Sequence, residues 1–600
     1  MVEWICGLAA AVAILGPGLG RGDLLNLDLV TTPRLRYPDW RWGVGPGLPH
    51  RVPLYVPLAW LSSFLDGAVV VKGLYLGALA ALFVGVWRLA GSGDRRVDAG
   101  VALAITWSPF TTTRVAVGHL SVVVAMATVA WAAPALFRLD AAARRPTRRL
   151  AGLAAFGGLV PGTWTLAVGA AGVIGGPKSE RRSRARQWLW LLPLQLWWLV
   201  PSALFAAAGP HLVGAGGFRP SIDVLAPLEL LGGLGFWRIP SQVPGPPWWP
   251  LIAAALLGAA ALGRSATRTR FGRPWALATT VAALVPVAAV LPPCSWLVRR
   301  LSDTFVGAPL REAQRWWGLA LVLLAPAVAA GVVEFGRRVG STRALVPVLP
   351  AAAALLLGGN GLWGMHGALA PVSYPAGWAA TATALRREPG ATLALPWHQY
   401  LDVSFAGGRR VLNPLPDYLP GDVVSSTDPE LGVPQEQVDA RAAPALAALE
   451  HPVEAASGLA ALGIRYVVVA RLGPPDAEVD QLARSSGVTT VYADPDIVLL
   501  RIDATATRPV SWWFGPFGRL AAGSAPLGVP AGPGWLLGGR SVPSSGGLLR
   551  PGPGSGVLWY WPGVLVASGD LCAALCWLSG GWGGLGSRRR FLRTADAQRT

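Results

Sequence analysis

The sequence is poor in charged residues, in lysine and in cysteine. Only 14% of its 600 residues are charged, against about 25% in a typical soluble domain. Hydrophobic residues make up 52%, and the mean hydropathy is +0.45. Lys72 and Lys178 are the only lysines, so arginine supplies almost all of the positive charge. Four cysteines are too few for a disulfide framework. These shortages argue against a soluble or disulfide-stabilised protein.

Arginine is concentrated in short clusters between long apolar stretches. The clusters are Arg95-Arg96, Arg144–Arg149, Arg181–Arg186, Arg264–Arg273, Arg337–Arg343 and Arg588–Arg590. Apolar spans with basic residues at one set of ends are typical of a multi-span membrane protein whose basic loops stay in the cytoplasm. The net charge of +19 is spread over these loops and forms no single stripe, which argues against nucleic-acid binding.

The apolar runs predict ten full spans plus one re-entrant hairpin. The first run is interpreted as an uncleaved span, because Glu3 stands where a signal peptide has basic residues. The run from Leu150 to Gly176 has basic clusters at both ends, and Pro161-Gly162 interrupts it, which favours two short helices that enter and return. The alternative is one ordinary span that violates the charge rule. The ten full spans are 4–19, 68–87, 97–110, 119–137, 188–207, 249–262, 275–291, 316–333, 345–357 and 557–578.

Composition divides the chain into four parts. We predict a multi-span domain over 1–370 with a first outer loop at 21–63, an extracytoplasmic α/β domain over 371–509, a Gly/Pro/Trp-rich return segment over 510–556, and a last span with a basic cytoplasmic tail over 557–600. The α/β domain lacks GxGxxG and P-loop patterns, so no nucleotide site is predicted. Its expected strands are 392–396, 410–412, 466–470, 490–492 and 497–502, and its expected helices are 442–462 and 476–486.

The first outer loop holds the strongest candidate for chemistry. Asp23 and Asp28 directly follow the first span, at the expected boundary between membrane and water. A carboxylate at such a boundary is costly to desolvate and tends to mark function, either as a general base or as a ligand of a divalent ion. The alternative is a solvated loop acid or a helix cap.

Several segments, in order along the chain, resemble a known family. They are Gly22–Val30 with Asp28, Gly45–Pro53, Pro109-Phe110 with Arg114 and Gly118-His119, Trp198–Pro201, Leu310–Arg315, and Tyr374-Pro375. Together they resemble actinobacterial multi-span proteins related to the GT-C glycosyltransferase superfamily. The resemblance implies a plasma-membrane enzyme that moves a sugar from a polyprenyl-phosphate donor to a cell-envelope glycan or lipid at the outer face. It also implies that Asp28 is the catalytic base.

The remaining candidate site residues are cationic. Arg114 at an outer turn suits a lipid phosphate, and the alternative is an arginine that reaches toward head groups. His119 suits a hydrogen-bond donor near neutral pH, and the alternative is a helix cap. Arg311 and Arg315 flank Glu312 and suit a diphosphate or an acceptor glycan, and the alternative is an internal salt-bridge cluster. All four are predicted to bind substrate.

Other interpretations of the sequence stay open at this point. No metal ligand set is predicted, because Asp28 has no securely placed second carboxylate beside it, and a bound divalent cation remains an alternative. A transporter or flippase of a lipid-linked substrate would use the Pro161-Gly162 break, and a non-catalytic envelope scaffold would use the α/β domain. In that domain Trp397-His398-x-Tyr400 and Asn413-Pro414 follow expected strands, where binding residues are common. Trp512-Trp513 is a further candidate for carbohydrate contact.

Overall fold

The computed structural model describes residues 1–579 apart from several stretches. Those stretches are 36–51, 140–147, 158–162, 209–225, 235, 237–246, 303, 305–306, 308–309, 311, 341–345, 429, 431–436, 438, 452–453, 473–480, 504–506, 509, 515–516 and 533. The predicted break at Pro161-Gly162, the candidate Arg311 and the basic tail therefore lie outside the described residues.

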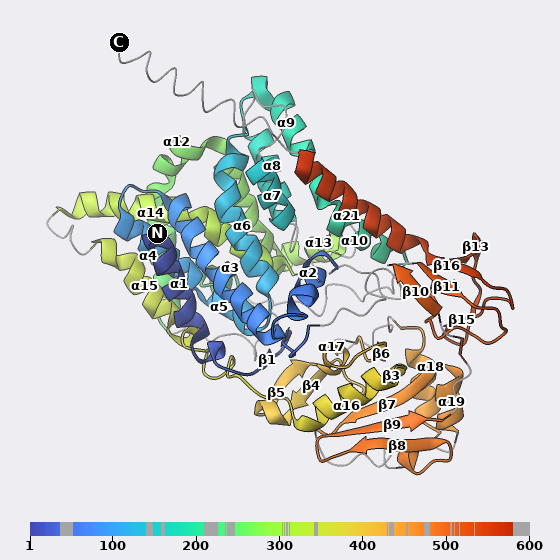
Figure 1. Ribbon diagram of the computed structural model, residues 1–600. Coiled ribbons are helices and arrows are strands. Elements are labelled where there is room, and N and C mark those ends of the chain that lie inside the picture. Colours follow the sequence, from blue (N-terminus) through green and yellow to red (C-terminus); the bar gives the residue numbers. More distant parts are fainter. Residues whose placement is uncertain are drawn as a thin grey trace.

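Most of the chain folds into a bundle of α-helices (Figure 1). Its helices are α1 (Val2–Leu15), α2 (Val52–Ser62), α3 (Gly67–Ala90), α4 (Arg95–Thr106), α5 (Pro109–Ala116), α6 (Leu120–Phe137), α7 (Arg148–Gly157), α8 (Thr163–Ile174), α9 (Arg181–Leu189), α10 (Leu196–Ala208), α11 (Ala226–Leu231), α12 (Trp249–Val290), α13 (Pro292–Ser302), α14 (Trp316–Val339), α15 (Leu349–Gly358) and α21 (Trp561–Ser579). Within the described residues, six segments are long and apolar enough to cross a membrane: Val2–Leu19, Gly67–Ala90, Leu120–Phe137, Trp249–Val290, Ala313–Val339 and Trp561–Ser579. The chain thus has a polytopic membrane fold.

The first loop and the basic residues Arg138 and Arg270 lie at opposite ends of this bundle. Helix α3 has 24 residues and is therefore about 36 Å long. It begins beside the first loop, where the Gly67 amide donates to the Pro33 carbonyl at 2.9 Å. It ends against Arg270, whose guanidinium donates to the last carbonyls of the helix. Arg138, which follows α6, donates to the Arg270 carbonyl at 3.1 Å. The length of one span therefore separates the first loop from these basic residues.

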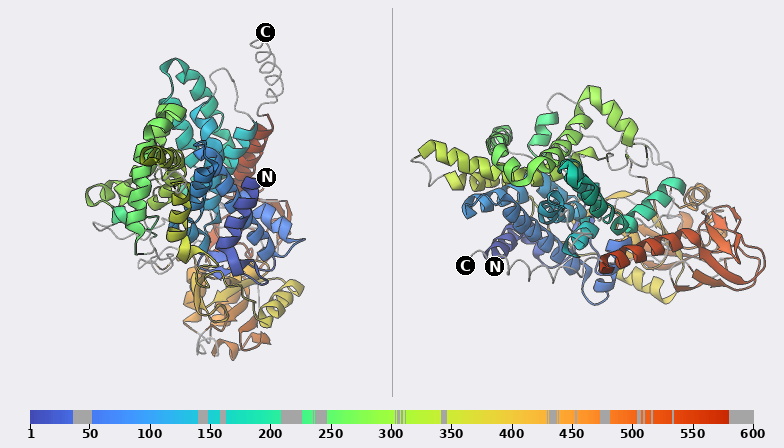
Figure 2. Two further views of the ribbon diagram at one scale, coloured as in Figure 1. Left: turned by 90° about the vertical axis from the view of Figure 1, so that its left-hand side faces the viewer. Right: turned by 90° about the horizontal axis from the view of Figure 1, so that it is seen from above.

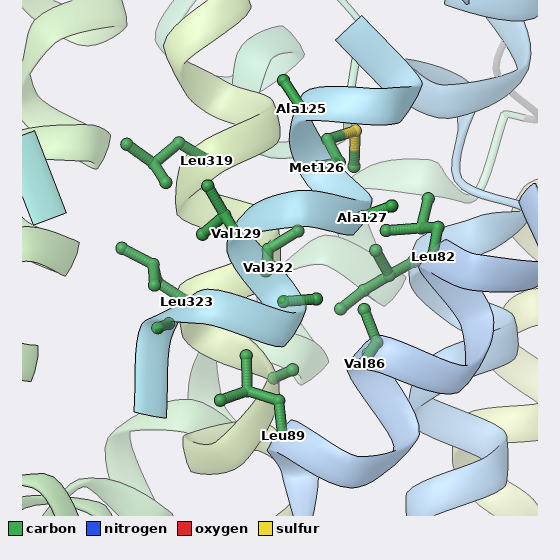
Figure 3. Close-up of a cluster of buried hydrophobic side chains, with 14 of the residues drawn as sticks. Leu82, Val86, Leu89, Ala125, Met126, Ala127, Val129, Leu319, Val322 and Leu323 are labelled. Carbon is green, nitrogen blue, oxygen red and sulfur yellow. The ribbon is translucent and has the colours of Figure 1, made fainter. Parts of the chain in front are cut away.

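Close packing holds the helices of the bundle together. Helices α3, α6 and α14 meet in a cluster of fully or almost fully buried side chains (Figure 3): Leu82, Val86, Leu89, Ala125, Met126, Ala127, Val129, Leu319, Val322 and Leu323. Helices α12 and α14 approach so closely that a Cβ on Gly263 would lie 1.9 Å from the Ala327 carbonyl oxygen, and one on Gly331 would lie 1.7 Å from that of Ala259. Small residues of this kind allow backbone contact between helices in lipid, where apolar burial alone gives little attraction.

Proline interrupts two of the predicted spans. The span expected over 97–110 ends earlier, because α4 stops at Thr106 and Pro109 begins the separate helix α5. The Ser108 hydroxyl caps α5 by accepting from the Thr111 amide at 3.3 Å, and proline suits a first helical position because it has no amide hydrogen to satisfy. The span expected over 188–207 is likewise split between α9 and α10, on either side of Pro193.

Two short helices occupy the stretch for which a hairpin is predicted. Helix α7 has 10 residues and α8 has 12, and both pack on α6. Arg184, which follows α8, donates to the Phe137 carbonyl at the end of α6. The end of α8 therefore lies at the same end of the bundle as the end of α6. Because α7 is the next helix after α6, this arrangement is the one expected for two helices that enter and return.

A five-stranded sheet forms the core of the α/β region. Its order is β6-β3-β7-β9-β8, and β3 is parallel to both of its neighbours while the other pairs are antiparallel. Val467 and Val469 pack toward α18 and α19, whereas Tyr466 and Val468 pack toward α16 on the other face. Alternation of this kind follows from the two-residue period of a strand. The bounds are α16 (Ala376–Arg387), β3 (Ala391–Leu395), β6 (Val423–Val424), α18 (Ala442–Leu449), α19 (Ala455–Ala461), β7 (Ile464–Ala470), β8 (Val488–Ala493) and β9 (Ile497–Ile502).

A separate hairpin joins this region to the bundle. Strands β4 (Tyr400–Val403) and β5 (Arg409–Leu412) pair antiparallel, and α17 (Leu415–Tyr418) follows them. The helix predicted over 442–462 is two helices, α18 and α19. Of the helix predicted over 476–486, residues 476–480 lie outside the described residues and 481–483 are helical.

The return segment is a β region, which the sequence analysis did not predict. Its main sheet has the order β10-β11-β16-β12-β13 and is antiparallel throughout. Its core contains Leu520, Trp535, Leu558 and Tyr560. The strands are β10 (Val510–Phe514), β11 (Phe517–Leu520), β12 (Trp535–Leu537), β13 (Arg540–Ser541), β14 (Ser544–Ser545), β15 (Leu548–Leu549) and β16 (Gly556–Tyr560). These short strands lie among glycines and prolines, which are depleted in strands and conceal the pattern that identifies one.

Both the α/β region and the β region lie at one end of the helix bundle (Figures 1 and 2). That end is the one at which the first loop emerges, because strands β4 and β5 contact the loop directly.

Candidate functional site

A tight hairpin presents Asp28. Strands β1 (Leu25–Asn26) and β2 (Leu29–Val30) pair antiparallel, and Leu27 and Asp28 form the turn between them. Leu27 has a φ of +49°, a left-handed conformation that is strained for a leucine. Strand β5 stabilises it: the Leu27 amide donates to the Arg410 carbonyl at 2.9 Å, and the Leu412 amide donates to the Leu27 carbonyl at 2.7 Å. The α/β region thus fixes the backbone that aims Asp28.

The turn between α5 and α6 lies directly against this hairpin. The Asn26 side-chain amide donates to the Ala116 carbonyl at 2.6 Å, and the Asp28 amide donates to the Val117 carbonyl at 3.2 Å. Gly118 has a φ of +89°, and a Cβ there would lie 2.2 Å from the Leu29 nitrogen. Only glycine permits this approach, which brings α5 and the start of α6 to Asp28.

The Asp28 carboxylate has partners from two distant parts of the chain. The Tyr400 hydroxyl, at the start of β4, donates to Asp28 Oδ1 at 2.6 Å. His119 Nε2 lies 3.1 Å from Asp28 Oδ2. The Asp28 side chain is still 32% exposed, so a substrate can reach a carboxylate whose orientation is already fixed.

The partners of His119 decide its tautomer. Arg114 Nη1 lies 3.0 Å from His119 Nδ1, and a guanidinium only donates hydrogen bonds. His119 Nδ1 must therefore accept, and its proton is on Nε2, which donates to Asp28. Burial lowers the pKa of His119 below its ordinary value of 6.5 and outweighs the opposing effect of the Asp28 hydrogen bond. His119 is thus neutral at physiological pH and relays the position of Arg114 to Asp28.

Arg114 is a buried cation. Its side chain is 2% exposed and lies over the rings of Phe110 and Phe236, with the guanidinium carbon 5.1 and 4.8 Å from their centroids. Burial lowers the pKa of Arg114 to about 9, so the group stays charged at neutral pH. The interfacial position considered for Arg114 is not observed, because the side chain does not reach the surface.

An ion pair extends the site from Arg114. Glu312 Oε2 lies 3.8 Å from Arg114 Nη1, and its other oxygen pairs with Arg315. Burial works to raise the pKa of Glu312, but Arg315 and the other nearby cations outweigh it, so the pKa is lowered and Glu312 is ionised. The salt-bridge alternative for this cluster is therefore present, and it is joined to the site. Arg315 is 23% exposed and is the cation of this group that reaches solvent.

The structure brings together Asp28, Arg114, His119 and Arg315, whereas Arg311 lies outside the described residues. Asp23 is not part of the group. It is 6% exposed, and its Oδ1 accepts from the Thr31 hydroxyl at 2.9 Å. Burial raises the pKa of Asp23 to about 6. Its role is to hold the loop in place, since its backbone also pairs with Val372.

Among the described residues, no three His, Cys, Asp or Glu side chains are placed to hold a metal ion. Both Asp28 oxygens already accept hydrogen bonds, from Tyr400 and from His119.

Two contributors to the site escaped the sequence analysis. Tyr400 was singled out only as part of a binding loop, and 372 residues separate it from Asp28. Phe236 stacks edge-on against His119 and covers Arg114. No local pattern reveals either contact, because each depends on how separate parts of the chain pack.

No family model matches this sequence, and no curated protein matches it. Solved structures do match. The fold is shared with a mycobacterial arabinofuranosyltransferase. The cryo-EM structure of the arabinofuranosyltransferase AftD from Mycobacteria superposes with a TM-score of 0.51 at 16% identity. A mutant of AftD superposes in two classes with TM-scores of 0.51 and 0.52 at 17% identity.

The alignment with AftD covers 86% of this chain but only 40–42% of AftD. The likeness therefore shows that the two proteins share a polytopic fold. The chain spans about two fifths of the length of AftD.

Proposed function

We propose that this chain is a membrane glycosyltransferase that moves a sugar from a polyprenyl-phosphate donor to a cell-envelope glycan or lipid. The observation that carries the proposal is the partly exposed Asp28 carboxylate, held by Tyr400 and His119 at the end of the bundle opposite the arginine clusters. The α/β region lies at this end too, and the positive-inside rule assigns this end to the extracytoplasmic side.

In the proposed reaction Asp28 is the general base. An acceptor hydroxyl transfers its proton to an Asp28 oxygen as the hydroxyl oxygen attacks the anomeric carbon of the donor. The bond from that carbon to the phosphate oxygen breaks, and the phosphate leaves with the electron pair. The tyrosine and histidine donors keep the carboxylate in a fixed orientation until the hydroxyl arrives.

Cations on the membrane side of Asp28 suit the leaving phosphate. Of Arg114 and Arg315, Arg315 has the more exposed side chain, and we propose that it contacts the phosphate oxygens. Arg114 is almost fully buried, so its proposed effect on the phosphate is through its charge and through His119. The likeness to AftD makes polyprenyl-phosphate arabinofuranose the first donor to test.

The direct test is the Asp28→Asn variant of the full chain in lipid nanodiscs. Asparagine keeps the shape of the side chain but cannot take a proton, so transfer from radiolabelled donor is expected to fall about a thousand-fold. Asp503→Asn is the matched control, because Asp503 is an exposed acid of the outer region that bonds Thr489. Unchanged transfer in Asp28→Asn would refute the proposal and favour a transporter or a scaffold. A strain without the protein is expected to accumulate the polyprenyl-phosphate sugar.

A further inference from the structure

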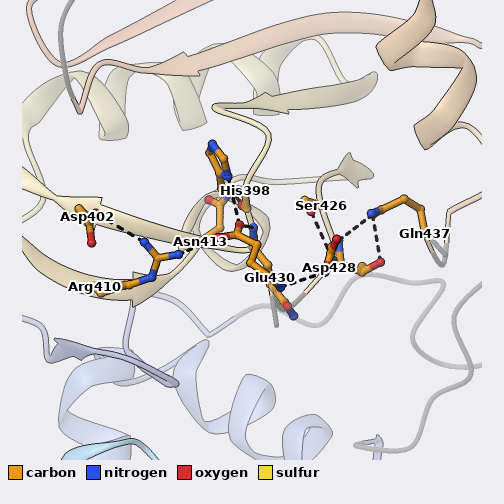
Figure 4. A network of polar contacts seen from close by, with 10 residues as sticks. His398, Asp402, Arg410, Asn413, Ser426, Asp428, Glu430 and Gln437 are labelled. Carbon is orange, nitrogen blue, oxygen red and sulfur yellow. Dashed lines mark hydrogen bonds and ion pairs between the residues drawn. The ribbon is translucent and has the colours of Figure 1, made fainter. Parts of the chain in front are cut away.

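A polar network lies beside the site on the outer hairpin (Figure 4). Arg410 on β5 pairs with Glu430 at 2.6 Å and with Asp402 on β4 at 3.5 Å. Glu430 also accepts from His398 Nδ1 at 3.1 Å and from the Gln399 amide at 3.2 Å. These residues have no part in the chemistry described above.

The network and Asp28 share one surface of the hairpin. Asp402 is two residues beyond Tyr400 on β4, so both side chains point to the same face, about 7 Å apart along the strand. Across the ladder Tyr400 pairs with Leu412, and Asp402 pairs with Arg410. The Arg410 carbonyl is also the group that holds Leu27. A molecule bound at Asp28 that extends along β4 therefore passes over the network.

Exposure marks the network as a binding surface. The side chains of Asp402 and His398 are 66% and 60% exposed. Glu430 has a φ of +58°, a strained conformation for a residue with a side chain. Ion pairs this exposed contribute little to stability, so folding alone does not account for the arrangement.

The charges on the two sides of Asp28 differ in sign. On the membrane side, Arg114 and Arg315 face the single carboxylate of Glu312. On the outer side, Asp402 and Glu430 pair with the guanidinium of Arg410, and Asp428 accepts from the Glu430 amide. An excess of carboxylates repels phosphate. Mixed donors and acceptors suit neutral hydroxyl groups, which do both.

We propose that Asp402, Arg410, Glu430 and His398 form the subsite for the neutral sugar units of the acceptor glycan. The donor phosphate then binds on the opposite, cationic side of Asp28. This assignment rests on the proposed transferase function, and it identifies the acceptor as a neutral glycan that extends from Asp28 along β4.

Kinetics on the full chain in nanodiscs test the subsite. The probes are a neutral arabinofuranosyl hexasaccharide as acceptor and polyprenyl-phosphate arabinofuranose as donor. In Asp402→Asn and in Arg410→Gln, the acceptor KM is expected to rise about ten-fold, the effect of weakening one hydrogen bond to a charged group. The donor KM and kcat are expected to stay the same. Arg465→Gln is the matched control, because Arg465 pairs with Glu388 elsewhere in the same region. An unchanged acceptor KM, or an equal rise in the donor KM, overturns the subsite.

Direct binding separates the subsite from the reaction. Saturation-transfer NMR of the hexasaccharide with wild-type protein, without donor, is expected to show binding that Arg410→Gln loses. Binding without any transfer would overturn the transferase function and leave the subsite standing. Transfer by wild type with equal hexasaccharide binding in Arg410→Gln would overturn the subsite and leave the function standing. Neither binding nor transfer would overturn both.

Discussion

At the scale of the residue, the site is a chain of hydrogen bonds with a fixed direction. Arg114 only donates, so His119 must accept at one nitrogen and donate to Asp28 at the other. Tyr400 donates to the second Asp28 oxygen. Both Asp28 oxygens are therefore aimed by donors from other parts of the chain.

Tyr400 is expected to matter as a positioning residue. Tyr400→Phe removes the hydroxyl that bonds Asp28 and leaves the ring, so kcat/KM is expected to fall about 10- to 100-fold, the effect of losing a hydrogen bond to a charged group. The control is Tyr492→Phe, which removes a hydroxyl that bonds Asp494 in the outer region. Equal rates for the two variants in the labelled-donor assay would show that the Tyr400 hydroxyl has no role.

The buried His119 makes stability depend on pH. Burial lowers the pKa of His119 in the folded protein below 6.5, the ordinary value that the unfolded chain keeps. Between the lowered pKa and about pH 6.5, the unfolded chain therefore binds a proton that the folded chain does not. Because the unfolded state binds more protons in this range, the contribution of His119 to stability is complete above about pH 6.5. That contribution is lost as the pH falls toward the pKa of the folded state. We expect the thermal inactivation midpoint to decrease between pH 7 and pH 5, and to decrease less in His119→Gln. Parallel decreases in both proteins would contradict this assignment.

At the scale of the element, the short helix α5 is what places Arg114. A continuous helix through residue 110 would extend past the first loop. Instead α4 ends at Thr106 and α5 begins at Pro109, so the chain changes direction toward Asp28. The close approach of Gly118 to Leu29 then locks the turn after α5 against the β1–β2 hairpin.

The Gly118→Ala variant tests this contact. The new Cβ would lie 2.2 Å from the Leu29 nitrogen and 2.4 Å from the Asp28 carbonyl carbon, so the hairpin must move by about 1 Å or more. Misplacement on that scale is expected to lower kcat about a hundred-fold. Gly73→Ala in α3 is the control, because a Cβ there meets nothing within 4 Å. If Gly118→Ala retains normal kcat, the contact does not position Asp28.

At the scale of the whole molecule, the bundle has one basic end and one end with the site. Helix α12 bends at Gly272, where φ is +71°, within the predicted basic segment between two spans. Its second half then leads to α13, at the end of the bundle where Glu312 and Arg315 join the site. The proposed orientation places α13 outside the cell and the bend of α12 inside.

Cysteine labelling in intact cells tests this orientation. Cys294 is exposed on α13, while Cys6, Cys572 and Cys576 lie within candidate spans and are partly buried. A membrane-impermeant maleimide is expected to label Cys294 from outside. In a Cys294→Ser background, Thr269→Cys near the bend is expected to react only after the cells are permeabilised. The reverse pattern would place Asp28 in the cytoplasm and end the proposed function.

Much of the fold was predictable, because it depends on short-range patterns. Apolar length gave the six segments long enough to cross a membrane, and five short runs of β-forming residues gave β3, β5, β7, β8 and β9. The carboxylates after the first span stood out because charged residues beside apolar spans are rare, whereas Arg114 and His119 were selected by the family resemblance. The β region over 510–560 was not predicted, because its strands lie among glycines and prolines, which are depleted in strands and conceal the pattern.

The sequence by itself determined that the chain crosses a membrane, where its cations gather, and which carboxylate follows the first span. Those properties follow from composition and from the order of residues. Tertiary structure alone decided that Tyr400 completes the site, that Arg114 is buried between two rings, and that Asp23 is apart from Asp28. The contacts of Asp28 with Tyr400 and of Arg114 with Phe236 join residues far apart in the chain. They depend on how the helices and the strands of the α/β region pack, which no local pattern encodes.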